Sequence, residues 1–280
     1  MNWARYVTAI VAGLSAAANA QIRPDMVPVS PTRATVWKWQ QIAGRDDYFY
    51  WSAKPGRPLV LSVPAAPGDH GGGFGDHLES FLGLKGYALG RLEWRGNLTH
   101  LLVPSAAVGK AYSDLARVRE LAPSRFDANR IVVFATAEAA FLGLQLATDR
   151  ARLTAAGIPP TSICALVLVD PQNVDPIEFG SPIARRQFAA DPGPRAALNP
   201  LASAAEAPPT IVLTEALDPR SKVQGDAVQA ALRSAGRSVV RVDFPRFVEM
   251  DERTYLGWPE GSATKQLDAF LDANCPPITR

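Results

Sequence analysis

The stretch that most constrains this chain runs from Arg130 to Leu144 and reads RIVVFATAEAAFLGL. Its first part is apolar and rich in β-branched residues, which is typical of a buried strand. A helical pattern begins directly after Phe134, so only a very tight turn fits between the two elements. The sequence therefore predicts a strand, a sharp turn and a helix in immediate succession.

The rest of the chain alternates in the same way between strands and helices. Most of the strands are apolar throughout, which favours a mainly parallel sheet covered by helices on both faces. The first two strands flank a turn and predict an antiparallel hairpin. The expected strands are 34–41, 47–52, 57–63, 87–94, 130–134, 162–169, 210–213 and 238–244, and the expected helices are 77–85, 105–121, the one that ends near 156, 222–235 and 262–273. The fold class expected is α/β.

The N-terminus has the pattern of a signal peptide. A basic start precedes a short apolar stretch, and Ala18-Asn19-Ala20 forms an A-x-A cleavage signal. We expect residues 1–20 to be removed and 21–280 to form a single domain, with 170–209 as a loop-rich insertion or cap. The mature protein is then expected to be secreted or periplasmic, without a membrane span.

Composition excludes some classes of partner. The net charge is +2 over 280 residues, so neither a nucleic-acid surface nor a polybasic membrane patch is indicated. No cofactor and no metal are expected. Cys164 lies in an apolar strand pattern and Cys275 follows the last helix. Cys164 is most simply a small buried apolar residue, and a disulfide between the two stays open because an exported protein can form one.

Several segments resemble the α/β-hydrolases of the carboxylesterase type, over nearly the whole mature chain. They are the strand and Gly-rich loop at 59–76, Lys85-Gly86-Tyr87, the 127–131 strand entry before the turn, Leu217-Asp218-Pro219 and the final strand, loop and helix. The resemblance implies the α/β-hydrolase fold. Enzymes of this kind use a serine, an acid and a histidine in that chain order, and backbone amides bind the oxyanion.

The turn after the central strand is where such enzymes carry the serine, in a G-x-S-x-G frame. The five positions here are Ala135-Thr136-Ala137-Glu138-Ala139, so Ala137 occupies the nucleophile position. A methyl group cannot attack a carbonyl carbon. Glu138 is either an ordinary first-turn helix residue or an acid in a cleft, since a helix N-terminus stabilises a carboxylate.

The other two triad positions also follow from the resemblance. Asp218 stands at the acid position, although an Asp before a Pro is also a common turn. Glu249 or Asp251 occupies the histidine position, and no histidine follows His100. A carboxylate there cannot take a proton and return it at neutral pH as an imidazole does.

The Gly-rich loop holds His70-Gly71-Gly72-Gly73, which looks like the H-G-G-G oxyanion motif of esterases. The alternative is a loop whose glycines only mark irregular backbone. Two hypotheses result. The first is an exported non-catalytic protein that keeps a cleft for a small-molecule ligand or a protein partner. The second is an esterase or lipase-like hydrolase of carboxylic esters that works through a non-standard site of His70, Glu138 and Asp218.

Overall fold

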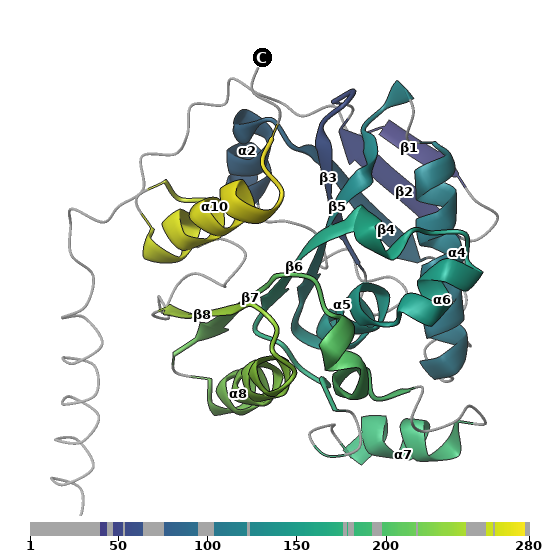
Figure 1. The fold of residues 1–280 in the computed structure, drawn as a ribbon, viewed down its shortest axis with the longest axis vertical. Helices are drawn as coiled ribbons and strands as arrows, with labels where there is room; N and C mark the ends of the chain where they lie inside the picture. The colour runs from purple at the N-terminus through teal and green to yellow at the C-terminus, as the bar shows by residue number, and fades with distance from the viewer. Residues whose placement is uncertain are drawn as a thin grey trace, which may run out of the picture. The chain divides into compact units, whose positions relative to one another are not determined.

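One eight-stranded sheet organises the protein, in the strand order β1-β2-β4-β3-β5-β6-β7-β8 (Figure 1). β1 and β2 pair antiparallel, β2 pairs antiparallel with β4, and every later pairing is parallel. The strands are β1 (Gln40–Ala43), β2 (Asp47–Ser52), β3 (Pro58–Ser62), β4 (Ala88–Trp94), β5 (Asp127–Thr136), β6 (Ile163–Val169), β7 (Thr210–Glu215) and β8 (Val239–Phe244). The expected α/β class, with a mainly parallel sheet and an antiparallel N-terminal pair, is confirmed.

The structure is a computed structural model that describes residues 40–43, 47–52, 54–63, 76–94, 104–121, 124–175, 178, 182–191, 198–216, 218–244, 256–259 and 261–277. The expected signal peptide and cleavage site lie outside these ranges. In the described part of the chain, no helix combines the length and the apolar character that a membrane crossing requires.

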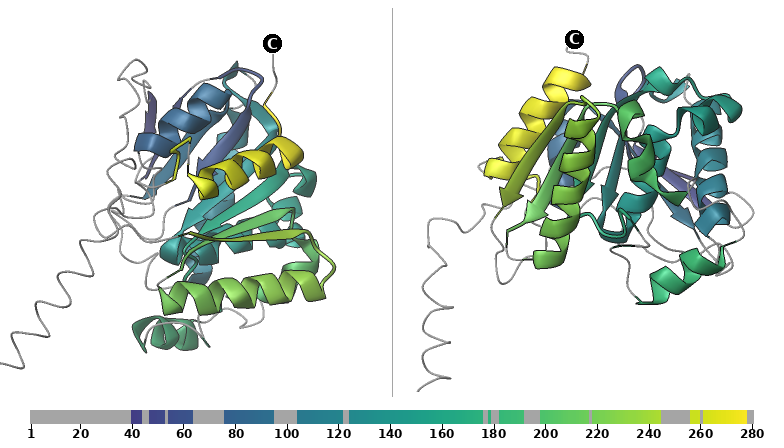
Figure 2. Two further views of the ribbon diagram at one scale, coloured as in Figure 1. Left: turned by 90° about the vertical axis from the view of Figure 1, so that its left-hand side faces the viewer. Right: turned by 60° about the horizontal axis from the view of Figure 1, so that its bottom comes forward.

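Helices cover both faces of the sheet (Figure 2). The α-helices are α2 (Asp76–Lys85), α4 (Pro104–Glu120), α5 (Ala140–Thr148), α6 (Arg150–Ala155), α7 (Pro182–Ala190), α8 (Pro219–Ser234) and α10 (Ser262–Asn274). One core cluster joins α4, α5 and α8 to the sheet, and a second joins α2 and α10 to its other face. Each expected strand and helix overlaps an observed element, and most ends agree within a few residues. Residues 34–39 of the first expected strand lie outside the described ranges.

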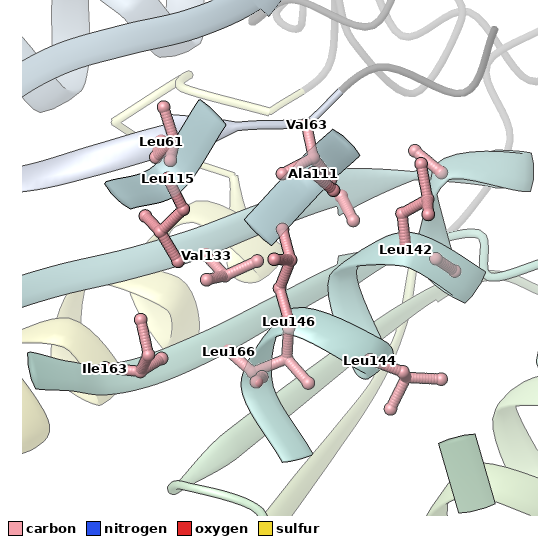
Figure 3. Packing of buried hydrophobic residues seen from close by; sticks show 14 of the residues in the cluster. Leu61, Val63, Ala111, Leu115, Val133, Leu142, Leu144, Leu146, Ile163 and Leu166 are labelled. Atoms are coloured by element: carbon pink, nitrogen blue, oxygen red, sulfur yellow. The ribbon is translucent and has the colours of Figure 1, made fainter. Parts of the chain in front are cut away.

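β5 supplies both cores because successive side chains of a strand point to opposite faces. Val133 and Ala135 belong to the cluster under α4 and α5, whereas Val132 and Phe134 belong to the cluster under α2 and α10. Figure 3 shows the first of these clusters, with Val133 among side chains from β3, α4 and α5. β5 is therefore buried at every position from Ile131 to Thr136, as expected for the centre of a sheet covered on both faces.

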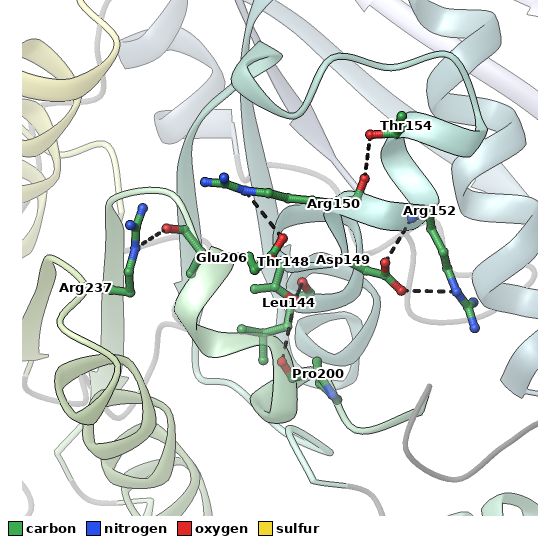
Figure 4. Close-up of polar contacts among 10 residues, drawn as sticks. Leu144, Thr148, Asp149, Arg150, Arg152, Thr154, Pro200, Glu206 and Arg237 are labelled. Carbon is green, nitrogen blue, oxygen red and sulfur yellow. Dashed lines mark hydrogen bonds and ion pairs between the residues drawn. The ribbon is translucent and has the colours of Figure 1, made fainter.

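The helix expected from the turn to about residue 156 is two helices. Asp149 breaks it, with φ −86° and ψ 84°, and its carboxylate accepts a hydrogen bond from the Arg152 backbone N–H (2.9 Å). An aspartate in this conformation ends one helix and caps the next. Figure 4 shows this cap and, beside it, the ion pair between Arg150 and Glu206 (3.5 Å).

The segment expected to be a loop-rich insertion, 170–209, contains α7 and a 3₁₀ helix, η6 (Pro200–Glu206). Two contacts hold the end of α7. Phe188 packs edge-on against Phe141 of α5 (ring centroids 4.9 Å apart), and Asp191 accepts a hydrogen bond from the Ser105 N–H of α4 (2.7 Å). The insertion is therefore attached to the first turns of α4 and α5.

Cys164 and Cys275 form a disulfide, with Cα atoms 5.6 Å apart. The interpretation of Cys164 as a small apolar core residue is therefore wrong. α10 packs on one face of the sheet, and Cys275, the residue that follows it, meets the second residue of β6. The Tyr87 hydroxyl donates to the Cys275 carbonyl (3.1 Å). The sequence alone did not show that Cys164 and Cys275, which are 111 positions apart, lie next to each other in the fold.

Candidate functional site

The tight turn lies directly after β5, at the carboxyl edge of the sheet. Ala137 has φ 46°, and residues Ala137–Ala139 form a 3₁₀ turn that leads into α5. A positive φ is uncommon for alanine because the β-carbon crowds the backbone. Ala137 is partly exposed and Glu138 is exposed. This is the sharp strand-to-helix turn that the sequence predicts, with no reactive atom on the residue at its apex.

The turn at Ala137 contains no glycine, and contacts with α5 and with the segment after β6 keep its shape. A β-carbon placed on Gly143 of α5 would lie 2.6 Å from the β-carbon of Ala135. The small residue that permits close approach of strand and helix is thus Gly143, one turn into the helix. The Ala137 carbonyl accepts a hydrogen bond from the Gln172 N–H (3.0 Å), which joins the turn to the segment after β6.

Asp218 stands after β7 at the start of α8. Its carboxylate accepts a hydrogen bond from the Arg220 N–H (2.9 Å) and so caps the helix. This is the structural role that its position before Pro219 allows. A carboxylate used in this way is still partly exposed, but the contact does not require a histidine partner.

Asp170, at the end of β6, is a site residue that the sequence reasoning missed. It is only 6% exposed and has φ 45°. Its Oδ1 accepts hydrogen bonds from the Ser221 hydroxyl (2.6 Å) and from the Glu215 N–H (2.5 Å). Asp170 therefore fixes the carboxyl ends of β6 and β7 to the first turn of α8. The signal was an aspartate that directly follows an apolar strand.

A second acid lies at the end of the sheet, on β8. Asp243 accepts hydrogen bonds from the Thr214 hydroxyl (2.5 Å) and from Arg241 Nε (2.9 Å). The Thr214 hydrogen bond, with a further contribution from Arg241, lowers the pKa of the Asp243 carboxyl. Arg241 also approaches Asp226 of α8 (3.3 Å).

Several predicted site residues lie outside the described part of the chain. These are His70, Gly71, Gly72 and Gly73 of the expected oxyanion loop, and Glu249 and Asp251 at the expected histidine position. The structure thus gives the backbone of two expected triad positions, Ala137 and Asp218, and Glu138 beside the first. In the described ranges His77 is the only histidine, and it lies in the first turn of α2 against the Trp258 ring (centroids 5.8 Å apart).

No group of three or more His, Cys, Asp or Glu residues that could hold a metal ion occurs within the described ranges. Three acidic side chains near the carboxyl edge have structural contacts: Asp218 caps a helix, Asp170 anchors two strands, and Asp243 forms an ion pair with Arg241.

Comparison with known proteins places the fold. No protein-family model matches the chain, and no curated protein matches it. Among solved structures it is similar to esterase B from Lactobacillus rhamnosis, with a TM-score of 0.65 and 16% identity over 97% of this chain and 93% of that one.

Two other solved esterases give the same result. A thermophilic esterase from Thermogutta terrifontis superposes with a TM-score of 0.61 and 17% identity over 84% of this chain and 90% of that one. For the Pyrobaculum calidifontis esterase the TM-score is 0.57, with 19% identity over 84% and 85% of the two chains. Identities this low speak for the fold alone. The chain therefore has the α/β-hydrolase fold.

Proposed function

We propose that this chain is an exported protein without serine-hydrolase activity that binds a small molecule or a protein partner at the carboxyl edge of its sheet. Ala137 is the observation that carries the proposal. It stands at the positive-φ turn between β5 and α5, where an esterase of this fold needs its nucleophile. An alanine side chain has no lone pair to attack an ester, so no acyl-enzyme can form there.

The acids around the turn support a non-catalytic reading. Asp218 caps α8, and the buried Asp170 accepts hydrogen bonds from Ser221 and Glu215. Each carboxylate thus has a sufficient structural reason to be present. Neither has a described imidazole to orient, and orientation of the base is what the acid of a triad contributes.

Export is supported by two independent features. The leader ends in the Ala18-Asn19-Ala20 signal, and the mature part carries the Cys164–Cys275 disulfide. Disulfides persist in oxidising compartments and are rare in the cytosol. Secretion or transfer to a periplasm is the simplest explanation of both.

The alternative is a hydrolase of carboxylic esters that works without the serine, through His70, Glu138 and Asp218. Exposure of Glu138 directly after the turn favours it, because an accessible carboxylate at a helix N-terminus can contact a ligand. In this alternative Glu138 acts as nucleophile or base.

Labelling and turnover separate the two. The mature protein is expected to show no labelling by a fluorophosphonate and no hydrolysis of nitrophenyl butyrate above heat-treated protein. Turnover that survives purification and disappears in Glu138→Gln would establish the alternative. Labelling would instead reveal an activated serine elsewhere and would contradict both readings.

Binding is tested with a matched pair of charge reversals. Glu138 is exposed at the carboxyl edge, and Glu120 is exposed at the last turn of α4, at the opposite edge. Calorimetry with nitrophenyl butyrate, which is uncharged, should show binding that Glu138→Lys weakens at least about tenfold, or about 1.4 kcal/mol, while Glu120→Lys leaves it unchanged. Equal effects of the two variants would place binding elsewhere.

A further inference from the structure

Left-handed backbone at residues other than glycine is confined to two neighbouring turns. Among the described residues, the non-glycine residues with a positive φ are Ala137 (46°), Asp170 (45°) and Asn173 (56°). Ala137 follows β5 and the other two follow β6, and these strands lie side by side in the sheet (Figure 1). Such conformations persist only where the surroundings determine the backbone, and they cluster at ligand sites. The two turns therefore mark one place on the carboxyl edge of the sheet.

Contacts at both ends hold the segment that follows β6. At its start, the Asp170 N–H donates to a carbonyl of β7 (2.8 Å). At its end, the Val174 N–H donates to a glutamine side chain of α8 (3.1 Å), and the Val174 side chain is fully buried. Between these points the Gln172 N–H donates to the Ala137 carbonyl (3.0 Å). Gln172 and its neighbour Asn173 are therefore held in place beside the turn after β5.

The amide side chains of these two residues have no partner in the protein. Gln172 and Asn173 are half-buried, and neither side chain has a hydrogen-bond partner among the described residues. Their polar atoms stay accessible to solvent. A left-handed asparagine often bonds to backbone groups nearby through its side chain, and this one does not. A polar group on a fixed backbone can bind a ligand with little further loss of conformational entropy.

We propose that Gln172 and Asn173 bind the ligand beside Ala137, and that this ligand is a small molecule with an amide group and no negative charge. The inference rests on the binding function proposed above. Each side-chain amide has a carbonyl acceptor and an NH₂ donor, which together complement the two groups of another amide. Glu138 is exposed next to Ala137, so a carboxylate on the ligand is repelled at this place.

The residue at the apex of the turn is consistent with this division of roles. Ala137 is partly exposed, so a ligand can contact its methyl group. A methyl group offers van der Waals contact but no hydrogen bond. Polar recognition at the turn must therefore come from neighbouring side chains, and the hydrogen bond between the Gln172 N–H and the Ala137 carbonyl places Gln172 and Asn173 next to it.

NMR titration of the isotope-labelled mature protein with N-acetylalaninamide tests the proposal. Binding is expected with a dissociation constant of about 1 mM or below, and the side-chain NH₂ signals of Gln172 and Asn173 should shift. Asn173→Asp keeps the shape of the side chain and removes its donor, whereas Asn173→Gly removes the side chain and accepts the left-handed backbone. Each variant should weaken binding about tenfold. N-acetylalanine, which carries a carboxylate, should bind at least about tenfold more weakly than the amide.

A matched pair of isosteric changes provides the control. Gln229 is also half-buried and without a hydrogen-bond partner in the described structure, but it lies in the second half of α8, away from the carboxyl edge where that helix begins. Gln172→Glu should weaken binding of N-acetylalaninamide about tenfold, and Gln229→Glu should leave it unchanged. Equal effects of these two variants, unchanged affinity in Asn173→Gly, or equal affinity for N-acetylalanine overturns the proposal.

The same spectra separate this inference from the binding function on which it rests. If nitrophenyl butyrate shifts the backbone signals of Ala137 and Glu138 while N-acetylalaninamide does not, the binding function stands and the assignment to amides is wrong. If neither compound shifts these signals or the side-chain signals of Gln172 and Asn173, both proposals are wrong.

Discussion

Gly143→Ala should destabilise this protein even though alanine is the better helix former. The new methyl group would lie 2.6 Å from the Ala135 β-carbon, 3.7 Å from Val133 Cγ1 and 3.8 Å from Leu166 Cδ1. The last two are ordinary contacts. The first is far inside contact distance, and neither β-carbon can rotate away, so α5 must move from β5 by about 1 Å.

The magnitude follows from two opposing effects. Replacing a helical glycine by alanine contributes about 1 kcal/mol of stability. Overpacking of a filled core costs about 1–3 kcal/mol, and the upper end applies here because α5 is buried along its whole length. A net loss of about 2 kcal/mol is expected, which corresponds to a fall in Tm of roughly 4–8 °C for a domain of this size.

The control is Gly109→Ala in α4. Gly109 is exposed, and a β-carbon there meets nothing within 4 Å. It should gain about 1 kcal/mol, so urea unfolding should separate the two Gly→Ala variants by about 3 kcal/mol. Adding Ala135→Gly to Gly143→Ala moves the methyl from strand to helix and should recover most of the loss. If Gly143→Ala is as stable as the parent, the close approach does not hold the turn.

Three further expectations concern the disulfide, the turn after β5 and the buried Asp170. Reduction of Cys164–Cys275, or replacement of both residues by serine, should lower the free energy of unfolding by about 3–5 kcal/mol, since the bridge spans 111 positions. Urea unfolding with and without reductant measures this loss, and coincident unfolding curves would contradict the expectation. Ala137→Gly should stabilise the protein by about 0.5–1 kcal/mol because glycine accepts φ 46° without strain; a loss in the same assay would mean that the methyl packs usefully. Asp170→Ala should lower the free energy of unfolding by about 3 kcal/mol, because the Ser221 hydroxyl and the Glu215 N–H lose the acceptor that Asp170 provides. Asp170→Asn keeps an acceptor oxygen and should lower it clearly less. Equal losses in the two variants would show that these hydrogen bonds do not account for the stability.

Sequence reasoning predicted the sheet because its evidence is local. Each parallel strand is a short apolar run with clear ends, and the central one, β5, is buried on both faces from Ile131 to Thr136. The resemblance to carboxylesterases implied the α/β-hydrolase fold, which the solved esterases support. The break at Asp149 was missed because a cap depends on a backbone conformation that the apolar pattern around it does not reveal.

The site was less accessible to sequence reasoning because its contacts are long-range. Asp170 meets Ser221 across 51 positions, and Cys164 meets Cys275 across 111. Neither partner lies in a recognisable motif. The assignment of Ala137 to the nucleophile position, and of Glu249 or Asp251 to the histidine position, stays a prediction.

Conformation and chemistry are separable at the turn after β5. A left-handed alanine costs about 1–2 kcal/mol and persists only where the surroundings determine the backbone. Here the surroundings are explicit: Gln172 binds the Ala137 carbonyl, and Gly143 lets α5 approach Ala135. None of these contacts involves the side chain at position 137. The same backbone can therefore present a serine or a methyl group, so the conformation of this turn does not depend on which of the two stands at position 137.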